Sequence, residues 1–166
     1  MEYETIAHNF APVYDQNSRV LILGTFPSVK SRAIHFYYGH PQNRFWKLLA
    51  LLTDSPVPQS VNEKKAFLLQ NRIALWDVIA QCEIVGSSDS SIRNVIPNDL
   101  TTILQTVPGI QIFANGAKAW ELYQKHMLPS TGRSCIKLPS TSPANAAWNL
   151  ERLKEGWIPV KEALFC

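Results

Sequence analysis

Short apolar runs recur along the chain, separated by longer segments of mixed polarity. Three largely apolar five-residue runs lie at 20–24, 73–77 and 110–114. A run this short, closed by turn or polar residues, predicts a strand that is buried on both faces. A shorter apolar run at 136–138 predicts a fourth strand.

The segments between these strands carry helical signals. Trp46 and Leu49 share one side of a helix predicted over 45–52, and Asn62 is placed to cap a helix that runs to Gln70. Further helices are predicted over 97–105, 117–126 and 146–154. The remaining stretches, which are predicted to be loops, are 25–44, 82–91 and 139–145.

Strands that alternate with helices indicate an α/β domain whose sheet is mainly parallel. In such sheets, ligands bind beyond the carboxyl ends of the strands. The segments that this order places at that edge are 24–28, Asp77, 115–116 and 139–143. We therefore expect the functional site there.

Length and composition are those of one folded domain spanning residues 1–166. The chain has 46% hydrophobic and 17% charged residues, which excludes an extended disordered chain. No apolar run approaches the ~18 residues that a membrane span needs, and residues 1–10 lack the apolar stretch of a secretory signal. We expect a cytoplasmic protein without membrane contact, and a monomer.

The cysteines are widely spaced at Cys82, Cys135 and Cys166. An odd count without a secretory signal argues against a disulfide framework, and no Cys/His cluster has metal-ligand spacing. We expect buried thiols, no metal site and no cofactor.

Charge is segregated along the chain, although the net charge is only +3. Residues 16–53 and 122–150 contain no acidic residue and together carry +8, so the remainder carries −5. Chance clustering or a surface that faces a polyanion would each explain this pattern. Because the two basic stretches also supply most loops at the expected edge of the sheet, the polyanion surface is favoured.

Four short motifs then occur in order: LGTFPS at 23–28, GHPQNRFWK at 39–47, IFANGAK at 112–118 and LPSTSP at 138–143. They resemble, in the same order, the motifs of the uracil-DNA glycosylase superfamily. The second motif is very similar to a segment of the mismatch-specific uracil/thymine DNA glycosylases. The resemblance implies a three-layer α/β/α fold with a central, mainly parallel four-stranded sheet.

Two departures from the superfamily pattern narrow the resemblance. Phe26 stands where most members carry a water-activating side chain, and Leu138 stands where the late loop often begins with histidine. Losing both while keeping Asn-Arg-Phe-Trp is similar to the hypoxanthine-DNA (deoxyinosine) glycosylase branch. In that branch the catalytic asparagine maps onto Asn43.

The resemblance therefore implies a monofunctional DNA glycosylase of base-excision repair. Such an enzyme hydrolyses the N-glycosidic bond of a flipped-out deaminated base, here hypoxanthine, in its partner DNA. Alternatives that stay open are a uracil or G:U/G:T mismatch glycosylase, and a catalytically silent nucleic-acid-binding module.

Roles follow for the remaining motif residues, each beside a structural alternative such as helix or turn capping. The expected base-binding residues are Phe26, Ser28, Asp77 and Asn115. The expected DNA-binding residues are His40, Arg44, Ser140, Thr141, Ser142 and Asn145. Asn43 is expected to orient the attacking water through its carbonyl oxygen, and Asp77 to accept the N1–H that hypoxanthine has and adenine lacks.

Overall fold

A computed structural model describes residues 2–165 and centres on a four-stranded sheet. Its strands are β2 (Val20–Gly24), β3 (Ile73–Asp77), β6 (Gln111–Asn115) and β7 (Cys135–Leu138). They lie in the order β3-β2-β6-β7, and every pairing is parallel. The register places Gly24 beside Asp77 and Asn115 beside Leu138, so these ends meet at one edge. The predicted sheet is confirmed.

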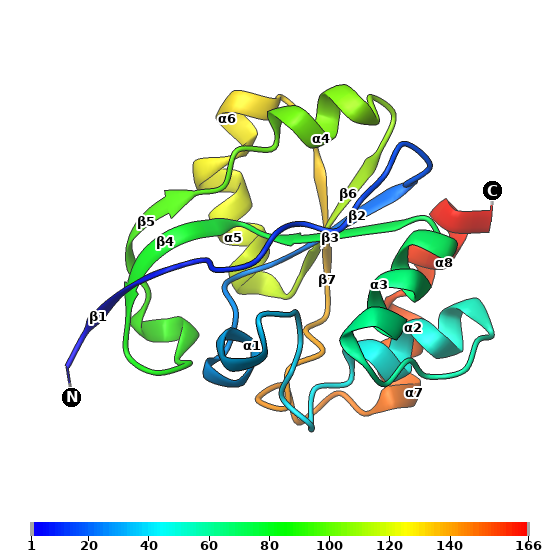
Figure 1. Cartoon of the computed structure of the whole chain (residues 1–166), viewed down its shortest axis with the longest axis horizontal. Coiled ribbons are helices and arrows are strands. Elements are labelled where there is room, and N and C mark those ends of the chain that lie inside the picture. The colour runs from blue at the N-terminus through cyan, green and yellow to red at the C-terminus, as the bar shows by residue number, and fades with distance from the viewer. Residues whose placement is uncertain (1, 166) are drawn as a thin grey trace.

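Helices cover both faces of this sheet (Figure 1). One face carries α2 (Phe45–Thr53), α3 (Val61–Gln70), α7 (Leu150–Gly156) and α8 (Ile158–Phe165). The other carries α4 (Thr101–Thr106), α5 (Ala117–His126) and α6 (Leu128–Thr131). The three-layer α/β/α architecture is therefore as expected.

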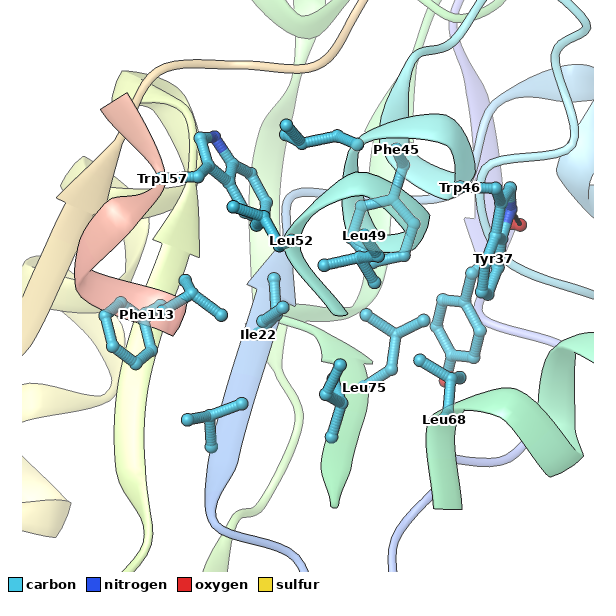
Figure 2. Packing of buried hydrophobic residues seen from close by; sticks show 14 of the residues in the cluster. Ile22, Tyr37, Phe45, Trp46, Leu49, Leu52, Leu68, Leu75, Phe113 and Trp157 are labelled. Carbon is cyan, nitrogen blue, oxygen red and sulfur yellow. Dashed lines mark hydrogen bonds between the residues drawn. The ribbon is translucent and has the colours of Figure 1, made fainter. Parts of the chain in front are cut away.

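The burial of β2 explains its uniformly apolar sequence. Val20 and Ile22 pack into the cluster under α2, whereas Leu21 and Leu23 pack into the cluster under α5. All four side chains are fully buried. Figure 2 shows Ile22 facing side chains from α2, among them Leu49 and Leu52. Alternate side chains of a strand point to opposite faces, so a sheet covered on both faces requires apolar residues throughout.

A second, antiparallel sheet lies beside the first and was not predicted. It consists of β1 (Glu4–Ala7), β4 (Ile79–Ile84) and β5 (Arg93–Pro97), in the order β1-β4-β5. The predicted loop over 82–91 is wrong at its start, because residues 82–84 belong to β4. These strands are partly exposed and two register shifts interrupt the β4–β5 pairing, so the sequence shows no clean alternation.

The predicted loop over 25–44 is also wrong in part. It contains the short helix α1 (Val29–Ile34), which Ser28 caps by accepting a hydrogen bond from the Ser31 N–H. His35 ends the helix in a left-handed conformation, with φ of 55°. Six helical residues are too few to produce a periodic pattern.

Three predicted helix starts shift as well. The helix predicted from residue 97 begins only at Thr101, because Pro97 ends strand β5. Ser60, with Glu63, forms the capping box of α3, in place of Asn62. The helix predicted from residue 146 begins only at Leu150, capped by the Asn149 side chain. Within residues 2–165, no helix is both long and apolar enough to cross a bilayer.

Candidate active site

A pocket of about 470 Å³ opens at the carboxyl ends of β2, β3 and β6. This volume lies within the roughly 300–1,000 Å³ typical of small-molecule sites. The predicted site residues that line it are Phe26, Ser28, His40, Asn43, Asp77, Asn115, Ser140, Thr141 and Ser142. The fold thus gathers residues from all four motifs around one cavity.

The back wall of the pocket depends on Gly24. A Cβ atom at this position would lie 2.4 Å from Asp77 Oδ1 and 2.8 Å from the Tyr38 hydroxyl oxygen. Only glycine leaves room for both polar groups at the end of β2. Those two oxygens therefore lie close together, at most about 5.2 Å apart.

Asp77 is a buried carboxylate, with 4% of the residue exposed. Its Oδ2 accepts a 2.8 Å hydrogen bond from His8 Nε2, and its backbone carbonyl accepts one from Asn98 Nδ2. Among the described residues, no hydrogen bond is made to Oδ1. Asp77 therefore offers one free acceptor at the pocket wall.

Tyr38 contributes a buried hydroxyl without a hydrogen-bond partner among the described residues. Its ring stacks on Phe45 with centroids 4.0 Å apart, and its backbone is left-handed, with φ of 52°. Burial and the nearby Asp77 charge raise the pKa of Tyr38; the Asn115 side chain opposes this rise without meeting full hydrogen-bond geometry. The hydroxyl therefore stays protonated, as a donor.

Asn43, Thr141 and Asn115 form one hydrogen-bonded network. Thr141 Oγ1 donates to Asn43 Oδ1 over 2.8 Å and accepts from Asn115 Nδ2 over 3.0 Å. The Thr141 N–H donates to Asn115 Oδ1 over 3.1 Å. Asn43 Oδ1 also accepts from the Phe45 N–H, at 3.0 Å. Asn43, which precedes the N-cap residue Arg44, therefore bonds the first backbone N–H of α2 while it lines the pocket.

This network changes what Asn43 offers to a ligand. Two donors already fill the carbonyl oxygen, which has two lone pairs. The expected orientation of a water through that oxygen is therefore not available in this geometry. The amide nitrogen makes no hydrogen bond to another described residue, so Asn43 presents donors to the pocket.

Thr141 does not fit the predicted DNA contact. Its exposed fraction is 0%, and its hydroxyl and N–H are both engaged with the asparagines. That prediction is wrong for the Thr141 side chain, because the loop folds inward and buries it. The Thr141 hydroxyl instead bridges the side chains of Asn43 and Asn115.

Arg44 is engaged by the loop of residues 139–148. Its guanidinium donates to four backbone carbonyls, those of Thr141, Ser142, Asn145 and Trp148. Four of the five guanidinium N–H groups are thereby used. The side chain predicted to contact DNA instead holds the shape of the loop, which also explains why helix α7 starts late.

Two other arginines of the acid-free stretches act in a similar way. Arg32 donates to the carbonyls of Pro27 and Gly86, and Arg133 to those of Pro108 and Ile110. Part of the charge segregation is thus structural. The lysines of these stretches, by contrast, are exposed at Lys30, Lys47, Lys125 and Lys137.

The serines of the late loop bond within it. Ser140 Oγ accepts from the Ser142 N–H, and Ser142 Oγ accepts from the Ala144 N–H, each at 3.1 Å. Asn145 Nδ2 donates to the Ser140 carbonyl, and Asn145 lines a neighbouring groove rather than the main pocket. Helix α7 begins well beyond these residues, so they do not form a helix N-terminal anion site.

Sequence reasoning missed His8, and it gave Tyr38 no individual role. His8 belongs to no motif, and Tyr38 lies in an aromatic segment whose neighbours Phe36 and Tyr37 are core residues. It also missed the β4–β5 loop, from which Ser87, Ser88, Asp89 and Ser90 line the pocket. The only available signal in the sequence was that this loop consists mainly of small polar residues.

The described residues contain no cluster of three or more side chains suited to a metal ion. Burial raises the pKa of the Cys135 thiol to about 12, and it raises that of Cys82 as well. Both thiols stay protonated at neutral pH and are poor nucleophiles. The chemistry of the pocket therefore rests on amide, hydroxyl and carboxylate groups.

The fold and site define an α/β protein with a pocket of about 470 Å³, into which carboxylate, amide and hydroxyl groups project, at the carboxyl edge of a parallel sheet. Residues 11–161 match the family model of the uracil DNA glycosylase superfamily, and the chain belongs to that superfamily. The resemblance inferred from the four motifs is confirmed.

Two curated relatives, from Methanosarcina acetivorans and Methanosarcina barkeri, are both named hypoxanthine DNA glycosylase. The first is 36% identical over 152 residues, covering 90% of this chain and 95% of the relative. The second is 34% identical over 151 residues, covering 89% and 93%. A solution NMR structure of a candidate uracil DNA glycosylase from Methanosarcina acetivorans aligns with a TM-score of 0.78 at 36% identity, covering 93% of this chain and 96% of that chain.

Proposed function

We propose that this protein is a DNA glycosylase that removes hypoxanthine from DNA by hydrolysing its N-glycosidic bond. The names of the two Methanosarcina relatives support this substrate. The structural observation that carries the proposal is the buried Asp77 carboxylate, whose Oδ1 is a free acceptor at the pocket wall.

An acceptor at this wall distinguishes hypoxanthine from adenine. Deamination of adenine places a hydrogen on N1, whereas adenine itself has a lone pair there that would face the carboxylate. A site built to hydrogen-bond a substrate N–H rejects an analogue without it by roughly 10⁴–10⁵-fold, because its own polar group is then left unpaired. Asp77 thus recognises hypoxanthine, the product of adenine deamination.

Asn43 remains the proposed catalytic residue, acting through its amide N–H groups. Cleavage leaves negative charge on the departing base, and a positioned donor stabilises that charge. The hydrogen bonds that Oδ1 accepts from Phe45 and Thr141 polarise the amide and strengthen its N–H donors. Phe26 would then form an apolar wall beside the base, a role that fits its place in the pocket lining.

The reaction requires the target nucleotide to leave the stack, at a cost of a few kcal/mol. We propose that two exposed lysines, Lys30 on α1 and Lys137 in the groove next to the pocket, contact phosphates of the DNA. No lysine lines the pocket in the described residues, which favours hydrolysis without a Schiff-base step. Because one chain supplies all these groups, we propose a monomeric enzyme.

The test is a single-turnover assay on duplexes that carry hypoxanthine, uracil, xanthine or mismatched thymine, with abasic sites revealed by alkaline cleavage. We expect hypoxanthine to be released fastest. Asn43→Ala should abolish release while duplex binding persists, and Asn62→Ala, at an exposed position on α3 outside the pocket, should behave like the wild type.

Other outcomes would assign a different function. Faster release of uracil or thymine would make the protein a uracil or mismatch glycosylase. Duplex binding without release of any base would indicate a silent binding module. Unchanged activity in Asn43→Ala would remove the catalytic role of that residue.

A further inference from the structure

His8 lies directly behind the pocket wall, although it does not line the pocket. Its Nε2 donates to Asp77 Oδ2 over 2.8 Å, and only 4% of the His8 side chain and 5% of the Asp77 side chain are exposed. A carboxylate can only accept, so the imidazole nitrogen is the donor. The pair is therefore shielded from water on the side away from the pocket.

Aromatic rings hold the His8 imidazole in place. Its centroid lies 4.5 Å from that of Phe10, 6.0 Å from Tyr37 and 6.3 Å from Phe26. Phe26 itself lines the pocket, so His8 packs against a residue of the pocket wall. At the same time it donates a hydrogen bond to the Asp77 carboxylate.

The backbone around Asp77 is fixed independently of His8. The Asp77 carbonyl accepts from Asn98 Nδ2 over 2.9 Å, and the next residue, Val78, donates its N–H to the Gly24 carbonyl over 2.8 Å. The remaining freedom of Asp77 is rotation of its carboxylate, a torsion with a broad energy minimum. The bond from His8 removes that freedom and leaves Oδ1 toward the pocket.

We infer that His8 is a positioning residue for base selection: it holds the Asp77 carboxylate so that Oδ1 accepts the N1–H of a deaminated purine. This inference rests on the proposed function. His8 acts through Asp77 and does not touch the base.

The inference makes the N-terminal segment part of the enzyme's selectivity. Strand β1 pairs with β4, with Ala7 opposite Gln81, and the His8 N–H donates to the Ala80 carbonyl over 2.7 Å. These bonds of the second sheet carry His8 to the end of β3. An element with no motif residue therefore supports the pocket wall from behind.

Two substitutions at His8 separate its hydrogen bond from its packing. His8→Phe keeps an aromatic ring but removes the donor, whereas His8→Gln keeps a donor near the position of Nε2. In single-turnover assays, we expect His8→Phe to lower kcat/KM for hypoxanthine about tenfold or more, the size of a lost hydrogen bond to a charged group. His8→Gln should stay within about threefold of the wild type. His126→Phe, a matched change on α5 outside the pocket, should have no effect.

A double-mutant cycle with Asp77→Asn tests whether His8 works through Asp77. In Asp77→Asn, the His8 donor should attract the amide oxygen and turn the amide N–H groups toward the pocket, where they oppose N1–H. Adding His8→Phe then frees the amide to rotate. We therefore expect His8→Phe to cause no further loss in the Asp77→Asn background.

The outcomes separate the inference from the proposed function. Equal losses from His8→Phe in both backgrounds, or a His8→Gln variant as impaired as His8→Phe, would overturn the positioning role while hypoxanthine release by the wild type stands. A wild type that does not release hypoxanthine would overturn the proposed function and this inference with it. Thermal unfolding of each variant, measured in parallel, identifies losses that come from misfolding. If His8→Phe misfolds, the test is His8→Gln, which should keep nearly wild-type release of hypoxanthine; a folded but impaired His8→Gln would overturn the positioning role.

Discussion

Gly24 and Asp77 lie opposite each other on paired strands, and a Cβ atom at position 24 would come within 2.4 Å of Asp77 Oδ1. The same atom would lie 2.8 Å from the Tyr38 hydroxyl oxygen. The absence of a side chain at Gly24 thus creates the space in which the Asp77 acceptor and the Tyr38 donor face the pocket together.

Gly24→Ala should therefore displace the Asp77 carboxylate and the Tyr38 ring. We expect a loss of about 1–3 kcal/mol in the free energy of unfolding, as for other overpacked sites, and a larger relative loss of hypoxanthine release. Denaturant unfolding and single-turnover kinetics measure the two effects. Gly109→Ala, where an added Cβ meets nothing within 4 Å, is the control and should change neither.

Thr141→Val should uncouple the two asparagines of the pocket. The substitution keeps the shape of the side chain but removes the hydroxyl that bonds Asn43 and Asn115. Leaving buried partners unpaired costs about 1–3 kcal/mol, so we expect lower stability and at least about tenfold slower base release. Thr102→Val, on an exposed face of α4, is the matched control. Wild-type rates in Thr141→Val would show that the network does not support catalysis.

Tyr38→Phe should act oppositely on stability and activity. Its hydroxyl is buried without a partner among the described residues. Removing it should therefore raise the free energy of unfolding by between zero and about 1 kcal/mol. If the hydroxyl donates to the carbonyl oxygen of the base, kcat/KM for hypoxanthine should fall. A destabilised variant with full activity would contradict both parts of this expectation.

Arg44→Lys should loosen the loop of residues 139–148 although it retains the charge. Lysine cannot reproduce a planar fork that reaches four carbonyls. We expect a loss of stability of about 2 kcal/mol or more, and amide hydrogen exchange should show faster exchange within the loop. Arg93→Lys, at a mostly exposed side chain paired with Glu83, should have little effect because surface ion pairs contribute little. If loop exchange is unchanged but duplex affinity falls, Arg44 contacts DNA after all.

Much of the pocket could be predicted because its residues stand at strand ends. Asp77 and Asn115 are the last residues of the buried strands β3 and β6, and parallel strands bring their carboxyl ends to one edge. The direction in which each side chain points, by contrast, could not be predicted from the sequence. Thr141 and Arg44 turn inward because unpaired loop carbonyls and amides require partners, and no pattern in the sequence states which partner each one finds.

The sequence by itself determined the central sheet, the edge at which the site forms, and membership of the superfamily. Burial on both faces is a local requirement, visible in runs such as 20–24, and motif residues keep their order along the chain. Only the tertiary structure decided that His8, the one histidine outside the two acid-free stretches, meets Asp77 across 69 residues. That contact arises because β1 docks on β4, and a pairing between partly exposed strands depends on the surface that the rest of the chain has already formed.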